Sequence, residues 1–567
     1  MKAKIALLLV LLIMLTAFTG CDSNSISTSP EASGTTQVTE QSSEPVNDGE
    51  GSDSDVSPDG PVYPLSDAIV TLTFWGPDIS TNNTALPTYA NLEAYDFWPY
   101  VEETTGIHLD MTIVSMTAES EKLNIVLASG DYTDIMAVNE AQVAGGTTAL
   151  LNEEIATDIS DIVEEYMPNY YDYISSGEDM LKLCYNDDGK MAGTRSWAEY
   201  YVPNQGLVVR QDLLEEMKLE LPSTIDELYE VLTAFKVTYD MDAPVWLGTS
   251  GQNSVSIVGA MGSAGFAGDR GSTTDHLYVQ DGKVVSSLSS DSYKEYLQLM
   301  NKWYIEGLVN QDFATNTDMD ASTTSVLNNR TAVLNAMYGQ ALSLQNSLEA
   351  DNPAAQLYAL ATPVVNEGDV NSFINNTPLS NTSWRIITSS CDDVELAARY
   401  IDWWYTEEGF LTANYGTKGL SYEIDGNGNP YYSDNVVNNS FGVDAGSAVE
   451  AYVTTNPIFG LIAMDRTVYL AGAQWVDDMM VIWTEQTSNG NVLPTGVSLT
   501  SEETESISTY SGDVATYATS EILLFIMGEK DFSQWDDYCG ELEAMGLSKV
   551  LSVYQAAYDR YLKRQTD

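Results

Sequence analysis

The residues with the most distinctive chemistry in this 567-residue sequence are aromatic rings that carry a polar group, because 11 Trp and 34 Tyr stand against only 12 Phe. A flat ring of this kind stacks on the C–H face of a sugar, while nearby carboxylates and amides bond the sugar hydroxyls. The same bias would also suit any exported protein with a wet surface. Four tryptophans lie at predicted strand ends or in loops rich in Gly, Ser and Asn, and we predict that they contact a ligand: Trp75, Trp197, Trp246 and Trp384.

Other tryptophans fall in stripes with helical spacing, and for these the sequence favours packing in a core. Residues three or four positions apart share one face of a helix, so a ring in such a stripe faces the interior. The tryptophans that we interpret in this way are Trp403, Trp404, Trp483 and Trp535.

The first part of the chain predicts the elements that position the candidate rings. Strand-like and helix-like segments alternate there, with strands at 68–76, 107–114 and 134–138 and helices at 91–105 and 120–128. Such alternation builds a parallel sheet with helices on its faces, and ligands sit beyond the carboxyl ends of its strands. We therefore predict that Asp78, Asn139 and Glu140 lie with Trp75 at one rim of an α/β fold.

Further along, Asp188-Gly189 predicts a hairpin turn, and Thr224-x-x-Glu227 forms a capping box that starts a helix over 224–236. A helix over 392–408 is expected to end at Gly409. The remaining predicted strands are 206–210, 330–336, 356–363 and 385–388, and the remaining predicted helices are 293–304, 513–527, one around Trp535 to Met545, and 548–564.

The N-terminal residues have the layout of a secretory signal, with Lys2 and Lys4 before an apolar run over 5–15 that is too short to span a membrane. Residues 15–21 resemble the lipobox of bacterial lipoproteins, which implies that Cys21 becomes the lipid-bearing N-terminus. An ordinary signal peptide with an incidental cysteine is the alternative. Residues 22–62 are mostly Ser, Thr, Gly and Pro with acidic but no basic side chains, so we expect a disordered tether.

Charge and composition exclude several classes of function. A net charge of −60 argues against nucleic acid and anionic lipid as partners, and more weakly against uronate chains. The spacing of Cys184, Cys391 and Cys539 indicates neither disulfides nor zinc, and we interpret all three as small buried residues. His108 and His276 are interpreted as structural or surface residues. The sequence has no GxSxG, HExxH or P-loop motif.

Several stretches resemble family 1 extracellular solute-binding lipoproteins, the sugar-capturing subunits of bacterial ABC importers. They are residues 129–138, 206–236, 293–312, 399–422 and 528–561. The resemblance implies an α/β, two-lobe fold of the type II periplasmic-binding class with hinge-connected lobes. One lobe would comprise 63–194 and 364–430, and the other 195–363 and 431–567.

The family's function, transferred to this chain, implies a lipid-anchored monomer on the outer face of the cell membrane. It would deliver an oligosaccharide, expected to be neutral, to permease subunits whose ATPase is a separate chain. The resemblance also implies that Tyr338, at the position between the lobes, presents a ring to the ligand. Trp475 is a further candidate from the second lobe.

Many relatives hold calcium in an acidic loop after the helix that matches 224–236, but residues 237–244 offer too few oxygen ligands, so we predict no metal and no cofactor. Asp425-Gly-Asn427-Gly-Asn429 starts like a calcium loop, yet Val436 stands where a bidentate Glu is needed, so a polar hairpin turn is the favoured interpretation.

Two other functions stay open. A surface glycosidase needs only a pair of carboxylates, and 83 acidic residues guarantee accidental pairs. A receptor for peptides or other small solutes could use the same fold, because a fold does not determine its ligand.

Overall fold

A computed structural model describes residues 62–78, 96–115, 118–198, 205–248, 276–316, 320–369, 380–440, 448–453, 462–463, 478–479, 481–483 and 493–564. The predicted signal, Cys21 and nearly all of the predicted tether therefore lie outside the described residues, as does Trp475. The described residues fall within the unit from Ser57 to Asp567, which contains two larger sheets and two short hairpins.

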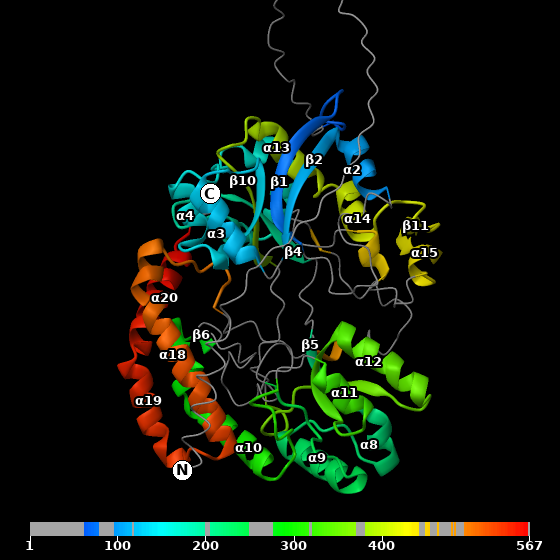
Figure 1. The fold of residues 1–567 in the computed structure, drawn as a ribbon, viewed down its shortest axis with the longest axis vertical. Helices are drawn as coiled ribbons and strands as arrows, with labels where there is room; N and C mark the ends of the chain where they lie inside the picture. The colour runs from blue at the N-terminus through cyan, green and yellow to red at the C-terminus, as the bar shows by residue number, and fades with distance from the viewer. Residues whose placement is uncertain are drawn as a thin grey trace, which may run out of the picture. The chain divides into compact units, whose positions relative to one another are not determined.

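The first sheet has the strand order β13-β4-β10-β3-β1-β2. Its strands β1 and β2 lie side by side in Figure 1. Its strands are β1 (Val70–Asp78), β2 (Ile107–Ser115), β3 (Ile135–Asn139), β4 (Gly193–Ala198), β10 (Ser380–Ile387) and β13 (Ile462–Ala463). The predicted strand–helix alternation is confirmed, because β1 pairs in parallel with both β2 and β3. The sheet is mixed, since β10 runs antiparallel to β3 and β4.

Helices surround this sheet and bury an apolar core against it. They are α2 (Phe97–Thr105), α3 (Glu119–Ser129), α4 (Gly146–Asn152), α5 (Val163–Tyr166), α6 (Pro168–Ile174), α7 (Glu178–Cys184), α13 (Val394–Trp403) and α14 (Glu407–Tyr415). Gly106 ends α2 with a φ of 76°, a left-handed conformation that glycine adopts without steric cost. Leu72 and Phe74 of β1 pack in one core cluster with Trp404 and residues of α2 and α13.

The second sheet has the order β8-β5-β9, and β5 is antiparallel to both neighbours. Its strands are β5 (Gln205–Arg210), β8 (Val333–Met337) and β9 (Leu357–Leu360), and the helices along it are α8 (Gln211–Met217), α9 (Ile225–Tyr239), α10 (Asp291–Ile305), α11 (Ala321–Leu327) and α12 (Tyr338–Asp351). The predicted capping box of α9 is confirmed, since the Thr224 side chain accepts from the backbone of Glu227 and the Glu227 carboxylate accepts in return.

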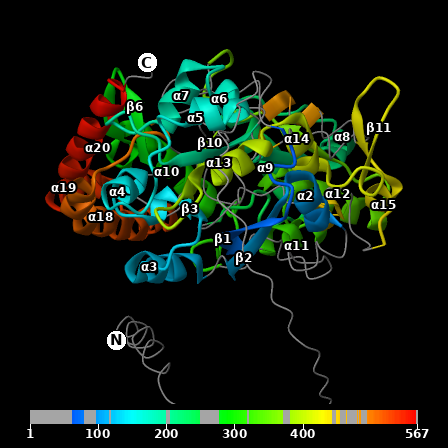
Figure 2. The same ribbon diagram turned by 90° about the horizontal axis from the view of Figure 1, so that it is seen from above.

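The C-terminal helices α18 (Ser501–Met527), α19 (Trp535–Ala544) and α20 (Leu547–Tyr561) pack together, as Figures 1 and 2 both show. Val514, Ile522 and Trp535 share one core cluster with α9 and α10. α18 starts at a capping box of Thr500 and Glu503, twelve residues before the predicted start at Asp513. Among the described residues, no helix has the length and apolarity needed to cross a membrane.

Short hairpins complete the described structure, with β6 (Leu277–Gln280) paired to β7 (Lys283–Ser286) and β11 (Tyr422–Ile424) paired to β12 (Pro430–Tyr432), followed by α15 (Asp434–Val437). The polar turn predicted between β11 and β12 is confirmed. One oxygen of Asp425 accepts from the backbone N–H groups of Asn427 and Asn429, each at 2.8 Å. These bonds lower the pKa of the Asp425 carboxyl, because they favour its charged form.

Two predicted elements are wrong. Asp188-Gly189 forms a turn but no hairpin, because the residues before it belong to α7 and the Asn186 side chain closes the turn by accepting from the backbone of Asp188 and Lys190. The helix predicted over 392–408 divides into α13 and α14, because Thr406 caps a new helix by accepting from the backbone of Gly409.

Gly409 therefore has a different role from the predicted helix stop. A side chain at this position would collide with the carbonyl oxygen of Trp403 and with the backbone of Trp404. Glycine permits this close approach of α14 to the end of α13.

The burial predicted for the helical tryptophans is confirmed, since Trp403, Trp404, Trp483 and Trp535 are all at most 4% exposed. The burial predicted for the three cysteines is confirmed in part, because Cys184 and Cys391 are buried whereas Cys539 is half-buried. His108 lies at the surface beside Glu102, and His276 is buried against Ser287.

Burial lowers the pKa of His276 to about 4. Between pH 6.5 and 4, His276 therefore binds a proton in the unfolded chain but stays neutral in the folded one. The free energy of unfolding should fall as the pH falls through this window, by about 1.4 kcal/mol per pH unit at most. His276→Gln removes this contribution and retains a partner for Ser287. We expect urea midpoints of the two proteins to converge on acidification, and parallel pH profiles would contradict the prediction.

A group of charged residues joins the C-terminal helix to the turn after α7. Arg560 and Arg564 both donate to the Asp187 carboxylate, at 2.8 and 2.7 Å, and Arg560 also pairs with Glu503 at the start of α18. Arg564 is only 8% exposed. The end of α20 is therefore integrated with the structure around α7.

Candidate functional site: a pocket beside Trp246

The chain segment after α9 positions Trp246 beside the second sheet. Val245 forms bridges with both Val309 and Val333, and the backbone of Trp246 donates to the carbonyl of Val333 at 2.9 Å. Neighbouring residues of an extended segment point to opposite sides. Val245 is buried in the core, whereas Trp246 packs partly against the cluster around α12 and keeps part of its ring accessible.

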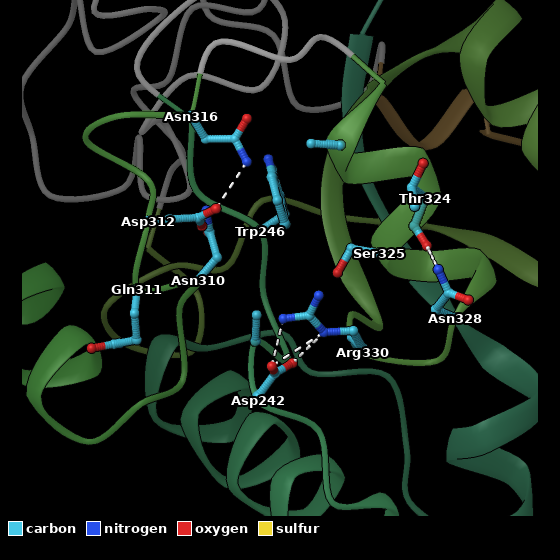
Figure 3. Close-up of a pocket in the computed structure, with 12 residues that line it drawn as sticks. Asp242, Trp246, Asn310, Gln311, Asp312, Asn316, Thr324, Ser325, Asn328 and Arg330 are labelled. Atoms are coloured by element: carbon cyan, nitrogen blue, oxygen red, sulfur yellow. Dashed lines mark hydrogen bonds and ion pairs between the residues drawn. The ribbon is translucent and has the colours of Figure 1, made fainter.

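A pocket of about 400 Å³ lies against this ring (Figure 3). Its volume is within the range of small-molecule sites, which are about 300–1,000 Å³. Most of the lining side chains are amides, carboxylates and hydroxyls, and Trp246 supplies the aromatic surface. The lining residues are Asp242, Ala243, Trp246, Asn310, Gln311, Asp312, Asn316, Ala321, Thr324, Ser325, Asn328 and Arg330.

One wall of the pocket is an arranged set of amides around a carboxylate. Asn310 is 4% exposed, and its side-chain oxygen accepts from the backbone of Leu247 at 2.8 Å. This bond aims the Asn310 Nδ2 at Asp312 Oδ1, at 3.2 Å, while Asn316 Nδ2 donates to Asp312 Oδ2 at 3.1 Å. A carboxylate can accept about four bonds, so Asp312 retains acceptor capacity for ligand hydroxyls.

The opposite end of the pocket holds an ion pair. Arg330 Nε lies 2.9 Å from Asp242 Oδ1, and Arg330 Nη2 lies 2.5 Å from Asp242 Oδ2. This bidentate ion pair is drawn below Trp246 in Figure 3. Hydrogen bonding to Arg330 lowers the pKa of Asp242. The pair is more than half exposed, so its position on the pocket wall matters more than its contribution to stability.

A second group of the predicted residues meets at the first sheet, near the end of β3. Glu140 accepts from Arg195 Nη2 at 2.9 Å and from Trp384 Nε1 at 2.8 Å, and the guanidinium of Arg195 lies 4.7 Å from the centre of the Trp384 ring. Arg195 is 1% exposed. Asn139 precedes this group and caps the short helix η3 (Glu140–Gln142) by accepting from Ala141.

The predicted ligand residues therefore separate into different surroundings. Trp75, Trp197 and Trp384 are 2–3% exposed and pack in the core clusters of the first sheet. The side chains of Asp78 and Tyr338 lie outside the described residues. Trp246 lines the pocket, and the participation of the other predicted residues in one shared site stays a prediction.

Sequence reasoning missed the partners of Trp246, among them Asp242, Asn310, Asp312 and Arg330. One signal could have found part of this set. Residues 310–316 directly follow Val309, which bridges to Val245, and a position just after an extended segment is also what selected Trp75. Arg330 comes from a different part of the chain, and only the bonds between 330–333 and 243–246 bring it to the pocket.

Structural comparison identifies the fold. A human milk oligosaccharide (HMO) binding, ABC-transporter-associated solute-binding protein from Bifidobacterium longum infantis ATCC 15697 superimposes with a TM-score of 0.69 at 19% identity, over 87% of this chain and 99% of that one. An alginate-binding protein, AlgQ2, gives a TM-score of 0.66 at 20% identity, over 87% and 99%. The fold is thus the two-lobe α/β fold of solute-binding proteins.

Sequence comparison identifies the family. The profile described as Bacterial extracellular solute-binding protein matches residues 81–409, more than half of the chain, and the chain belongs to this family. It is similar to the fructooligosaccharide ABC transporter substrate-binding protein FusA of Streptococcus pneumoniae serotype 4 (strain ATCC BAA-334 / TIGR4). The two are 25% identical over 487 residues, which cover 81% of this chain and 86% of FusA.

Proposed function

We propose that this protein captures neutral oligosaccharides outside the cell and delivers them to an ABC transporter. The observation that carries the proposal is the pocket in which an indole ring faces amides, a carboxylate and hydroxyls. A sugar offers a C–H face to the ring and hydroxyls to the polar groups. The names of the relatives support this ligand class, because FusA is named for a fructooligosaccharide and a structural neighbour for milk oligosaccharides.

The alternatives have less support. The relatives compared above carry names of binding proteins rather than enzymes, which weakens the case for a glycosidase. A peptide receptor needs partners for a continuous run of backbone groups, whereas the pocket combines one ring with scattered hydroxyl-bonding groups.

Capture would proceed by closure of two lobes about a hinge. Open and closed forms exchange, and a sugar that contacts both lobes only in the closed form shifts the population toward it. Glu140, whose side chain is partly accessible near the end of β3, is proposed to meet the sugar from one lobe while Trp246 meets it from the other.

A thermal-shift screen of neutral glycans, acidic glycans and peptides tests this function. A ligand at 100 times its dissociation constant stabilises the folded protein by about 2.7 kcal/mol, which raises the melting temperature measurably. We expect shifts with neutral oligosaccharides, and chromatography should return the sugar uncut. Shifts with peptides alone, or the appearance of new reducing ends, would refute the proposal.

We also propose that Cys21 carries the lipid that holds the protein at the cell surface, with the transporter's permease as its partner and a separate ATPase. Several acyl chains anchor a protein durably, because each buried methylene contributes about 0.8 kcal/mol. Cys21→Ala should release the protein into the medium, as measured by blotting of membrane and medium fractions. Undiminished membrane retention of this variant would contradict the anchor.

A further inference from the structure

Proteins with this fold are named for sugars that differ in charge. Fructooligosaccharides are uncharged, whereas alginate is a chain of uronates. The fold therefore leaves the choice of charge to residues of the pocket. The inference below rests on the function proposed above and concerns how the pocket beside Trp246 makes that choice.

The charged residues of the pocket are few. Among the twelve lining residues, all of them described by the structure, Arg330 is the only cation, and Asp242 and Asp312 are the anions. Arginine is the side chain best suited to a sugar carboxylate, because its planar fork donates to both carboxylate oxygens at once. A uronate in this pocket could form an ion pair with no lining residue other than Arg330.

Asp242 already occupies that fork. Three contacts between 2.5 and 3.1 Å join its two oxygens to Nε and Nη2 of Arg330. This edge presents two parallel N–H groups to a carboxylate, and Asp242 bonds to both of them. Since the pair is exposed, water weakens it, yet a ligand carboxylate must still displace Asp242 to bond to Nε and Nη2.

The surroundings reinforce this arrangement. Hydrogen bonding to Asp242 and the charge of Asp242 raise the pKa of the Arg330 guanidinium, and the charge of Asp312 adds to this effect. With two carboxyl side chains and one guanidinium, the lining has one more acidic than basic side chain. A uronate would meet net repulsion there, whereas a hydroxyl can donate to Asp312 at no such cost.

We propose that Asp242 is a specificity-determining residue: it covers the guanidinium fork of Arg330 and so makes the pocket reject acidic sugars in favour of neutral ones. Its role is electrostatic and steric at once. Removing its charge while keeping its shape should free Arg330 to bind a carboxylate.

The test uses the neutral oligosaccharide that gives the largest shift in the thermal screen and the same sugar oxidised at its primary alcohols to carboxylates. Isothermal titration measures both ligands at low salt, where charge effects are least screened. The natural protein should prefer the neutral sugar by at least about tenfold. Asp242→Asn should improve binding of the oxidised sugar by about tenfold, as one charge-assisted hydrogen bond to a freed arginine allows.

Two further variants separate the explanations. Asp242→Asn combined with Arg330→Gln should lose the gain, because the freed cation is absent. Glu395→Gln removes one negative charge from an ion pair with Arg399 on α13, far from the lining residues in the chain, and should leave the preference unchanged. An equal gain from Glu395→Gln, or no gain from Asp242→Asn, would overturn the inference while leaving neutral-sugar binding intact. The absence of any neutral ligand would instead overturn the proposed function, and the inference with it.

Discussion

Trp246→Ala is expected to weaken oligosaccharide binding by about 30-fold, which corresponds to about 2 kcal/mol. The ring is the only aromatic surface among the residues that line the pocket, and the amide and hydroxyl groups around it cannot replace stacking on a C–H face. Isothermal titration with the best neutral glycan measures the loss. Trp246→Phe retains a smaller ring and should lose less.

Tyr431→Ala serves as the control for this prediction. Tyr431 is a half-exposed ring on β12 that lies outside the pocket lining, so its removal should leave affinity unchanged. The melting temperature of each variant without ligand reports its folding, which matters because Trp246 also packs against the core around α12. Equal affinity of Trp246→Ala and the natural protein would show that the ligand binds elsewhere.

Glu140→Ala is expected to destabilise the fold by about 3 kcal/mol, because it leaves the guanidinium of a 1%-exposed Arg195 without its carboxylate. The variant also removes the acceptor of Trp384 Nε1. Both losses fall in the interior of the first sheet, where water cannot compensate fully. Urea unfolding followed by circular dichroism measures the change.

The matched control for Glu140 is Glu153→Ala, which removes the same side chain from an exposed position after α4. It should change stability by no more than about 0.5 kcal/mol. A small effect from Glu140→Ala, comparable with that of Glu153→Ala, would contradict the structural role of the Glu140–Arg195 pair.

The order of strands and helices could be predicted from the sequence where a local signal was strong. The capping box at Thr224, the helix end at residue 105 and the apolar runs of β1 and β5 each depend on residues a few positions apart. The division of the helix at Trp404 could not be predicted, because Gly409 is also compatible with a helix stop. Its actual role depends on the close approach of two chain segments.

The site was less predictable than the fold. The same reasoning from position selected Trp246, which lines a pocket, and Trp75 and Trp197, which the structure buries. A sequence shows where a strand ends but not which neighbours cover the ring. Asp242 and Arg330 are separated by a long stretch of chain, so their pairing follows only from the tertiary structure.

The arginines at the end of α20 have a practical consequence for binding assays. Because Arg560 and Arg564 hold Asp187 and Glu503, trimming the chain before residue 564 removes part of the interior rather than a loose tail. Biosensor chips should accordingly capture this protein through its N-terminal side, the end by which a lipidated Cys21 would attach it in the cell. Attachment there leaves the C-terminal helix unstrained during titration.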